Sequence, residues 1–335
     1  MSSIAITETG KIEIFYLKKI WFYYQNSGSS KYDKDELQVD WIYINAIFNI
    51  LGLGTEPTLK FLLNETSSFE VFEDWVLENG KVSPDLCRQF NDLVTNKHSR
   101  AEPIEESTVL SEADLHHWET KGYVVIRGAV PREDCEKTAE LIYKTLDATP
   151  EDETSWYKSH PLKQGIMVQM FHNELLDKNR LAFKIRKAFE ELWKRNDLLV
   201  SMDRVSFNPP ETEFYRFPGP NLHWDVSLKK TIPFGLQGLL YLSDTEKTQG
   251  AFTVIPGFHN VIDSWLDNLE IGTNPRETKL LDGYEREAIA GGVGDFIIWN
   301  QCLPHGSCPN SSTKPRIVQY INYQPIDLKL QEEWI

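Results

Sequence analysis

The sequence predicts an α+β protein in which a helical N-terminal region precedes helices packed around an antiparallel β-core. Two observations predict this class. Residues 1–95 carry apolar side chains at helical spacing, whereas the chain after about residue 198 consists mostly of short apolar runs separated by glycine and proline. Many short strands at such spacing are typical of an antiparallel sandwich or barrel.

Length and composition are those of a folded protein with a sizeable core. The 335 residues, of which 41% are hydrophobic and 12% aromatic, suffice for one large domain or two modest ones. The net charge of −15 leaves no basic face that would attract phosphates. No apolar run approaches the ~20 residues that a membrane span needs. We therefore expect neither nucleic acid nor a membrane as a partner, and the charge leaves a small-molecule substrate open.

The four cysteines indicate a reducing compartment. Cys87, Cys135, Cys302 and Cys308 form no CxxC pair, and the first residues lack the basic and then apolar layout of a secretory signal. Reduced thiols in a cytoplasmic protein, monomeric or homodimeric, are the expectation.

Helices are expected throughout residues 1–95, the predicted N-terminal region. The segment 67–80 begins with serine caps and ends at Gly80, and the next helix has Ser83 as its cap with Pro84 at its first position. Apolar side chains of the first of these helices fall on one stripe, which predicts core packing. A polar segment without hydrophobic periodicity, residues 96–109, is the predicted linker to a second domain, 110–335.

The second domain begins with helices and continues with strands. Helices are expected at 111–122, at 131–149 with Pro131 at the start, and as a single helix over 173–195. Short strands are expected within 123–130, 198–207, 222–228, 234–244, 250–257, 294–300 and 316–326.

One expected strand carries two ligand-type side chains on the same face. In "LHWDV", His223 and Asp225 alternate with apolar neighbours, so both point one way while Trp224 points the other. An imidazole and a carboxylate buried together need each other, water or a metal as a partner. Alone, this H-x-D pattern is a weak signal.

A downstream segment strengthens the interpretation of His223 and Asp225 as a pair of metal ligands. In "GDFIIWNQCLPHGSCPNSSTKPRIVQY", an apolar strand leads into a loop that presents His305, and Arg316 begins the next apolar strand. Two histidines and one carboxylate form the facial triad of non-haem Fe(II), which leaves coordination positions open. An arginine in an apolar strand needs an anion, and its planar fork suits a carboxylate.

These motifs resemble the phytanoyl-CoA dioxygenase family of Fe(II)/2-oxoglutarate-dependent oxygenases. The resemblance covers roughly residues 110–325. It begins at "GYVVIRGAVPREDCEKTAELI" and continues through "HWD" and "GAFTVIPGFH" to "GDFIIWNQCLPHGSCPNSSTKPR", the most specific stretch. It implies a double-stranded β-helix, a jelly-roll or cupin-like core with flanking helices, whose open end holds the metal. It also implies Fe(II), 2-oxoglutarate and O₂ as cofactor and co-substrates.

The resemblance also implies roles for individual residues. The ligands would be His223, Asp225 and His305, with Arg316 and Ser307 binding the distal carboxylate of 2-oxoglutarate. In halogenating relatives a small residue replaces the carboxylate ligand, so Asp225 favours hydroxylation. The resemblance further implies a polar side chain near iron from "IMVQMFHN", either Gln169 or Asn173.

The substrate class is inferred by analogy with the family. We expect a small polar metabolite, a free amino acid or a natural-product intermediate, with Arg204 or Arg216 binding a substrate carboxylate. Trp224 is expected to pack in the core and, lying between two ligands, is also a candidate substrate contact. The alternatives are a pseudo-enzyme or non-catalytic 2-oxoglutarate- or metal-binding sensor of the same fold, and a cupin-type metalloenzyme without 2-oxoglutarate, which Arg316 disfavours.

Overall fold

The computed structural model describes residues 1–335 except 1–3, 27–38, 96–107, 220, 326–330 and 332. The chain forms two compact units. One comprises Met1–Pro103, Arg195–Met202 and Gln324–Leu330, and the other comprises Ile104–Lys194, Asp203–Tyr323 and Gln331–Ile335. Most of the predicted linker lies outside the described residues, and the division at 1–95, 96–109 and 110–335 stays a prediction.

The first unit consists mainly of helices. They are α1 (Leu17–Asn26), α3 (Trp41–Ile50), α4 (Thr55–Asn64), α5 (Phe69–Asn79) and α6 (Pro84–Val94). The expected stripe on α5 is buried at Phe69, Phe72 and Val76, and the Ser68 hydroxyl accepts a hydrogen bond from the Val71 N–H at 3.3 Å. Helix α4 lies within the region 1–95 that was expected to be helical. The helices share one apolar core, and the short strand β4 (Leu198–Val200) also contributes to it.

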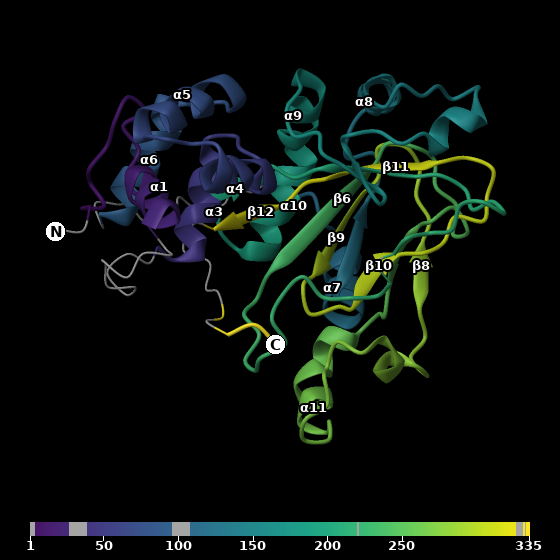
Figure 1. The fold of residues 1–335 in the computed structure, drawn as a ribbon. Coiled ribbons are helices and arrows are strands. Elements are labelled where there is room, and N and C mark those ends of the chain that lie inside the picture. The colour runs from purple at the N-terminus through teal and green to yellow at the C-terminus, as the bar shows by residue number, and fades with distance from the viewer. Residues whose placement is uncertain (1–3, 27–38, 96–107, 220, 326–330, 332) are drawn as a thin grey trace. The chain divides into compact units, whose positions relative to one another are not determined.

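The second unit is built on two antiparallel sheets (Figure 1). The larger sheet has the strand order β1-β9-β6-β11-β5-β3-β2. Its strands are β1 (Tyr123–Ile126), β2 (Lys163–Gln164), β3 (Met167–Val168), β5 (Val205–Asn208), β6 (Leu236–Tyr241), β9 (Phe296–Asn300) and β11 (Arg316–Tyr320). The smaller sheet orders β10 (His305–Ser307), β7 (Phe252–Val254) and β8 (Glu287–Ile289). A separate two-stranded sheet, formed by β12 (Tyr323–Pro325) and β4, belongs mainly to the first unit.

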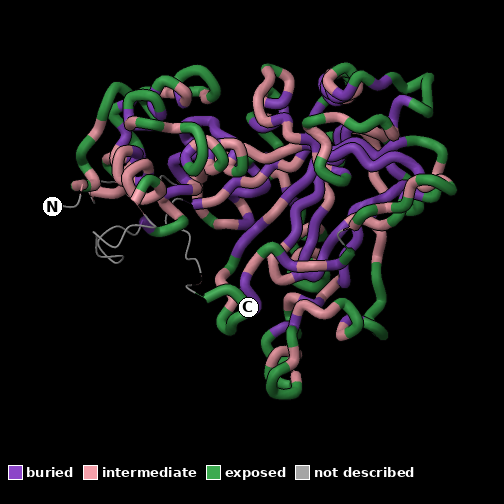
Figure 2. The backbone as a smooth tube through the Cα atoms, in the orientation of Figure 1, coloured by how far each residue is buried: buried purple, intermediate pink, exposed green. Residues whose placement is uncertain are grey.

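The two sheets enclose a common core. Leu239, Ile297 and Val318 of the larger sheet belong to the same buried cluster as Phe252 and Val254 of the smaller sheet. Because strand side chains alternate, residues two positions from these core residues on the same strand face this interior as well. Buried central strands are visible in Figure 2. The double-stranded β-helix expected from the sequence is confirmed.

Helices cover the outer face of the larger sheet. They are α8 (Arg132–Thr145), α9 (Glu174–Arg180) and α10 (Phe183–Trp193). Tyr143 packs edge-on against Phe207 at a ring separation of 5.4 Å, and Phe189 packs against Phe296 at 6.0 Å. Helix α7 (Glu112–Lys121) ends at Gly122, whose φ of 80° is left-handed. A short helix α11 (Ile262–Asp267) follows β7. None of the described helices is long and apolar enough to cross a bilayer.

Two expectations were wrong. The single helix over 173–195 is broken between α9 and α10, because Ala182 has the non-helical ψ of 126°. The strand over 222–228 is absent: His223 forms only an isolated bridge with His305, and bends follow.

Candidate metal centre

Three ligand-type side chains converge at one end of the β-core. His223 comes from the irregular segment before β6, Asp225 lies two residues later, and His305 begins β10. Their potential ligand atoms all lie within 4.8 Å of one another. The Asp225 carboxylate is 3.3 Å from His223 Nε2 and 3.2 Å from His305 Nε2. The two histidines are joined through their backbones, since each N–H donates to the other's carbonyl at 2.9 Å.

Both imidazoles are oriented by the same local contact. His223 Nδ1 lies 2.8 Å from the Asn221 carbonyl, and His305 Nδ1 lies 3.0 Å from the Leu303 carbonyl. A carbonyl only accepts, so Nδ1 carries the proton in each ring and Nε2 points its lone pair into the site. A lone pair facing a carboxylate oxygen needs a proton or a cation between them.

The electrostatics of the cluster are strongly coupled. Burial would raise the pKa of Asp225, but hydrogen bonds and charge from His223 and His305 outweigh it and lower that pKa far below its usual range. Burial lowers the pKa of His223, and its hydrogen bond and charge interaction with Asp225 outweigh this and raise the pKa above 6.5. In the absence of a metal, a proton stabilises the cluster.

A residue that the sequence did not single out fixes the carboxylate. Gln237 Nε2 donates to Asp225 Oδ2 at 2.8 Å, while the Trp299 indole N–H donates to Gln237 Oε1 at 3.0 Å. Because an indole nitrogen can only donate, the amide must turn its NH₂ towards Asp225. Gln237 and Trp299 are direct neighbours across β6 and β9, and both face the interior. Only strand pairing, which the sequence does not reveal, brings them to the site.

Arg316 lies on the inward face of β11. It has the same parity as the core residue Val318, and its side chain is fully buried. Its Nη2 donates to Ser206 Oγ at 2.9 Å, but Nε and Nη1 have no hydrogen-bond partner among the described residues. A buried guanidinium with two unused donors needs a planar anion.

The structure places the remaining predicted polar residues in different surroundings. Ser307 lies two residues after His305 on the same face of β10. Asn173 is the N-cap of α9, where its Oδ1 accepts from the Leu175 N–H at 3.0 Å. Gln169 Nε2 donates to Gln164 Oε1 at 3.0 Å. Their roles towards cofactor or substrate stay predictions.

Trp224 is a core residue, as expected. Its ring is buried in the same apolar cluster as Phe258, and its indole N–H donates to the Cys302 carbonyl at 3.0 Å. Arg204 lies directly before β5, where its carbonyl accepts from the Tyr320 N–H at 3.2 Å. Arg216 lies in an exposed loop, 3.8 Å from the Glu211 carboxylate. Contacts of these three side chains with a substrate stay predictions.

The donor set fits the metal that the fold implies. Ligands about 2.1 Å from one octahedral ion are about 3 Å apart when adjacent, close to the separations between Asp225 and the two imidazoles. Two neutral imidazoles and one carboxylate leave room for further ligands.

Sequence comparison agrees with this site. The profile of the family "Phytanoyl-CoA dioxygenase (PhyH)" matches residues 118–318, which is more than half of the chain. The chain belongs to this family. It is thus an oxygenase by family, and His223, Asp225 and His305 form a group that could hold a metal ion. A protein of Dictyostelium discoideum named "Putative phytanoyl-CoA dioxygenase" is 25% identical over 264 residues, which cover 62% of this chain and 74% of that one.

Two of the solved structures that match this chain share little sequence with it. EctD from S. alaskensis with bound Fe has a TM-score of 0.48 at 17% identity, covering 69% of this chain and 84% of that one. HygX from Streptomyces hygroscopicus, with nickel and 2-oxoglutarate bound, has a TM-score of 0.46 at 17% identity, covering 65% and 88%.

Proposed function

We propose that the protein is an Fe(II)- and 2-oxoglutarate-dependent dioxygenase that hydroxylates an unactivated C–H bond of a small polar metabolite. A free amino acid or a natural-product intermediate is the proposed substrate class. His223, Asp225 and His305 would hold the iron, and Arg316 would bind the distal carboxylate of 2-oxoglutarate, with Ser307 assisting.

The buried guanidinium of Arg316 carries this proposal. A metal site alone would fit many enzymes, but the two unpartnered donors, Nε and Nη1, call for a dicarboxylate or similar anion inside the barrel. Iron and 2-oxoglutarate, when bound, would supply the oxidising chemistry, in which one oxygen atom of O₂ would go to the substrate and the other to succinate, with release of CO₂.

The chain's own residues orient and protect the reacting groups. Neutral imidazoles offer Nε2 because both Nδ1 protons are held by carbonyls. Gln237 fixes one oxygen of Asp225, and the core around Trp299 and Phe252 shields His305, whose side chain is only 5% exposed. The Asp225 side chain is 51% exposed, so this side of the site is open to an incoming substrate. A carboxylate at position 225, instead of a small residue, favours hydroxylation over halogenation.

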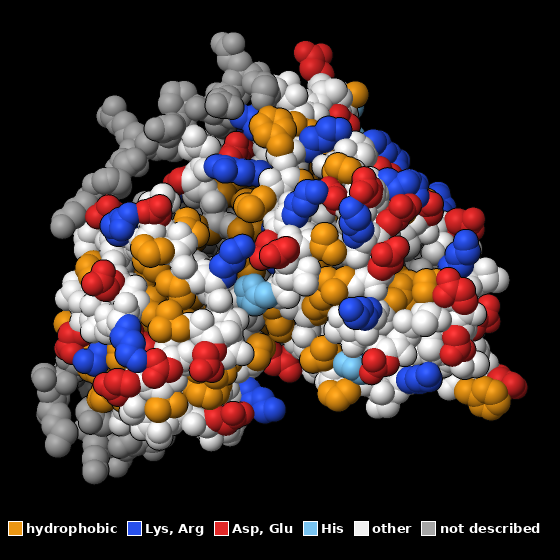
Figure 3. Space-filling view, turned by 90° about the horizontal axis from the view of Figure 1, so that it is seen from above, with side chains coloured by type: hydrophobic (Ala, Val, Ile, Leu, Met, Phe, Trp, Pro, Cys, Tyr) orange, Lys and Arg blue, Asp and Glu red, His pale blue; other side chains and the backbone are white. Residues whose placement is uncertain are grey.

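The surface is consistent with a small-molecule substrate. Acidic and basic side chains are interspersed on the face shown in Figure 3, without a broad basic area. A cytoplasmic location and a monomeric or homodimeric state are part of the same proposal.

The test begins without oxygen. Protein loaded anaerobically with Fe(II) and 2-oxoglutarate should develop the metal-to-ligand charge-transfer band, and folded protein without this band would refute the proposal. Candidate amino acids that perturb the band are then incubated in air. Succinate release with a product heavier by one oxygen atom supports hydroxylation, whereas binding without succinate release supports the sensor.

A further inference from the structure

The segment that carries Asp225 lacks the support of a β-ladder. Residues 224–228 form no strand, so their carbonyl groups have no neighbouring strand as a donor. Buried or partly buried carbonyls need other partners. The contacts that replace the ladder therefore decide where the carboxylate lies.

Arg276 provides two of these contacts. Its Nη1 donates to the Trp224 carbonyl at 2.8 Å, and its Nη2 donates to the Val226 carbonyl at 2.6 Å. The two acceptors are the residues directly before and after Asp225. A single planar guanidinium thus spans the ligand residue and fixes the backbone on both sides of it.

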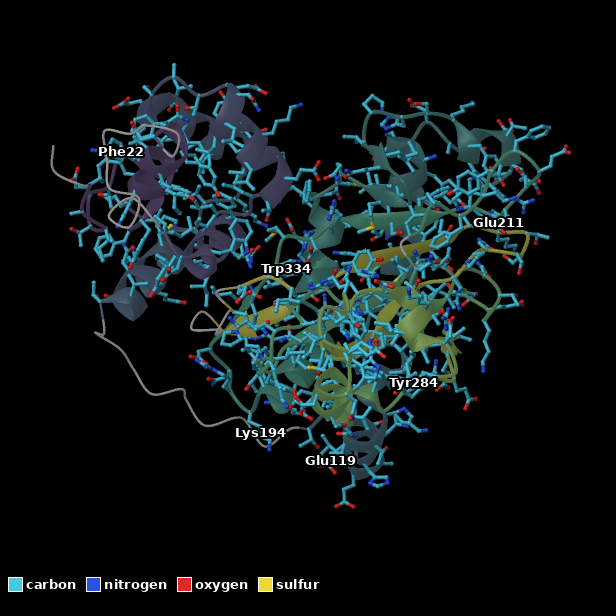
Figure 4. The ribbon with its side chains drawn as sticks, turned by 60° about the horizontal axis from the view of Figure 1, so that its bottom comes forward. Phe22, Glu119, Lys194, Glu211, Tyr284 and Trp334 are labelled. Carbon is cyan, nitrogen blue, oxygen red and sulfur yellow. The ribbon has the colours of Figure 1, made fainter. Side chains whose placement is uncertain are left out.

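The last residues of the chain hold Arg276 in turn. The Ile335 backbone oxygen accepts from Arg276 Nε at 2.9 Å, and the guanidinium lies over the Trp334 ring at 4.5 Å from its centroid. Trp334 is labelled in Figure 4. We name residues 333–335 the C-terminal latch.

The latch also binds the segment beyond Asp225 directly. Ser227 Oγ donates to the Glu333 carbonyl at 2.7 Å and accepts from the Ile335 N–H at 3.1 Å. The Leu228 N–H donates to the Ile335 backbone oxygen at 3.2 Å. Residues about a hundred positions apart thus form one hydrogen-bonded assembly behind the carboxylate.

We infer that Arg276, held by the C-terminal latch, is a positioning residue that sets the backbone of Asp225 and thereby the affinity and geometry of the metal site. The inference rests on the proposed function, because it assigns Asp225 as a metal ligand. It goes beyond that function by making a residue 51 positions from Asp225 part of the metal centre.

The test compares metal binding by full-length variants. Arg276→Met keeps an extended side chain but removes all donors, whereas Arg276→Lys keeps the charge without the fork. Arg286→Met is the matched control, because Arg286 is also a loop arginine and pairs only with Asp282, at 3.6 Å, among the described residues. Co(II) affinity is measured by chelator competition, the Co(II) absorption bands report coordination geometry, and thermal unfolding of metal-free protein reports stability.

Arg276→Met should weaken Co(II) binding by about 10- to 100-fold and shift the absorption bands, as expected for loss of a partner behind a ligand. Arg276→Lys should have a Co(II) affinity between those of Arg276→Met and the wild type. Arg286→Met should bind Co(II) as tightly as the wild type does. If Arg276→Met does not fold, Arg276→Lys and Trp334→Ala are used instead, and both should bind Co(II) more weakly than the wild type.

Two results separate the inference from the proposed function. Variants that melt earlier but bind Co(II) with wild-type affinity and spectrum would overturn the positioning role and leave the oxygenase proposal intact. Wild-type protein that binds no Co(II) would overturn the proposed metal site itself.

Discussion

Two arginines that are equally buried should respond in opposite ways to the same substitution. Arg316 and Arg180 are 0% and 1% exposed. Arg180 donates from Nη1 to the Asp177 carboxylate at 2.8 Å and from Nη2 to the Asp203 carbonyl at 3.0 Å, and its Nε has no hydrogen-bond partner among the described residues. Among the described residues, Arg316 has one serine hydroxyl as its partner and leaves two donor atoms unused.

Arg316→Met should leave the metal-free, co-substrate-free protein nearly as stable as the wild type, or more stable. An unsatisfied buried donor costs about 1–3 kcal/mol, and methionine removes these donors while filling part of the space. Arg180→Met should instead cost about 3–5 kcal/mol, because it breaks the buried ion pair with Asp177.

For binding of 2-oxoglutarate, Arg316→Met should be the more damaging of the two substitutions. Two charge-assisted hydrogen bonds from Nε and Nη1 contribute about 1.5–3 kcal/mol each, so their loss should weaken binding by about 10²- to 10⁴-fold. Arg180→Met should bind normally as long as it is folded. Thermal unfolding with and without co-substrate, and anaerobic titration of 2-oxoglutarate, measure both effects. Normal 2-oxoglutarate affinity in Arg316→Met, or a loss of stability equal to that of Arg180→Met, would refute the reasoning.

Three further predictions concern the metal centre and the thiols. Gln237→Leu removes the donor to the Asp225 carboxylate and should weaken Co(II) binding about tenfold in chelator competition; an unchanged affinity would contradict it. Metal affinity should rise with pH, and the rise should extend above the ordinary titration range of histidine, because the pKa of His223 is raised and its proton must leave before Nε2 can bind a metal. A titration of Co(II) binding from about pH 5.5 to 8.5 measures this, and a flat profile would speak against it. Burial raises the pKa of Cys135 and of Cys302 to about 12, so iodoacetamide should label neither thiol appreciably in native protein at about pH 8. Mass spectrometry of the labelled protein checks this, and rapid modification of either thiol would be the contrary result.

Local signals in the sequence predicted much of the fold. The serine cap before α5, the end of the helix expected at 111–122 and the apolar runs of β6, β9 and β11 depend on neighbouring residues and appeared where expected. The ligand-type residues of the candidate site were also found, because histidine and aspartate stand out in apolar surroundings.

Long-range contacts could not be predicted in this way. The bridge between His223 and His305 and the bonds from Arg276 replace a strand at 222–228, although alternating polarity predicted one. The sequence does not distinguish Gln237 from other glutamines in strands, because only the pairing of β6 with β9 brings it next to Trp299. The break after α9 falls in a stretch with good helix formers, where Ala182 leaves the helical conformation.

The backbone pairing of His223 with His305 fixes the position of the candidate metal site, whereas the side chains determine its chemistry. Reciprocal N–H to carbonyl bonds are typical of antiparallel neighbours whose Cα atoms are about 5.5 Å apart, whatever side chains they carry. The spacing between these two positions is therefore a property of the polypeptide backbone. Exchange of one donor side chain would alter which ion the protein prefers without moving the place where the ion binds. Metal preference could therefore change in evolution while the backbone at the site stays the same.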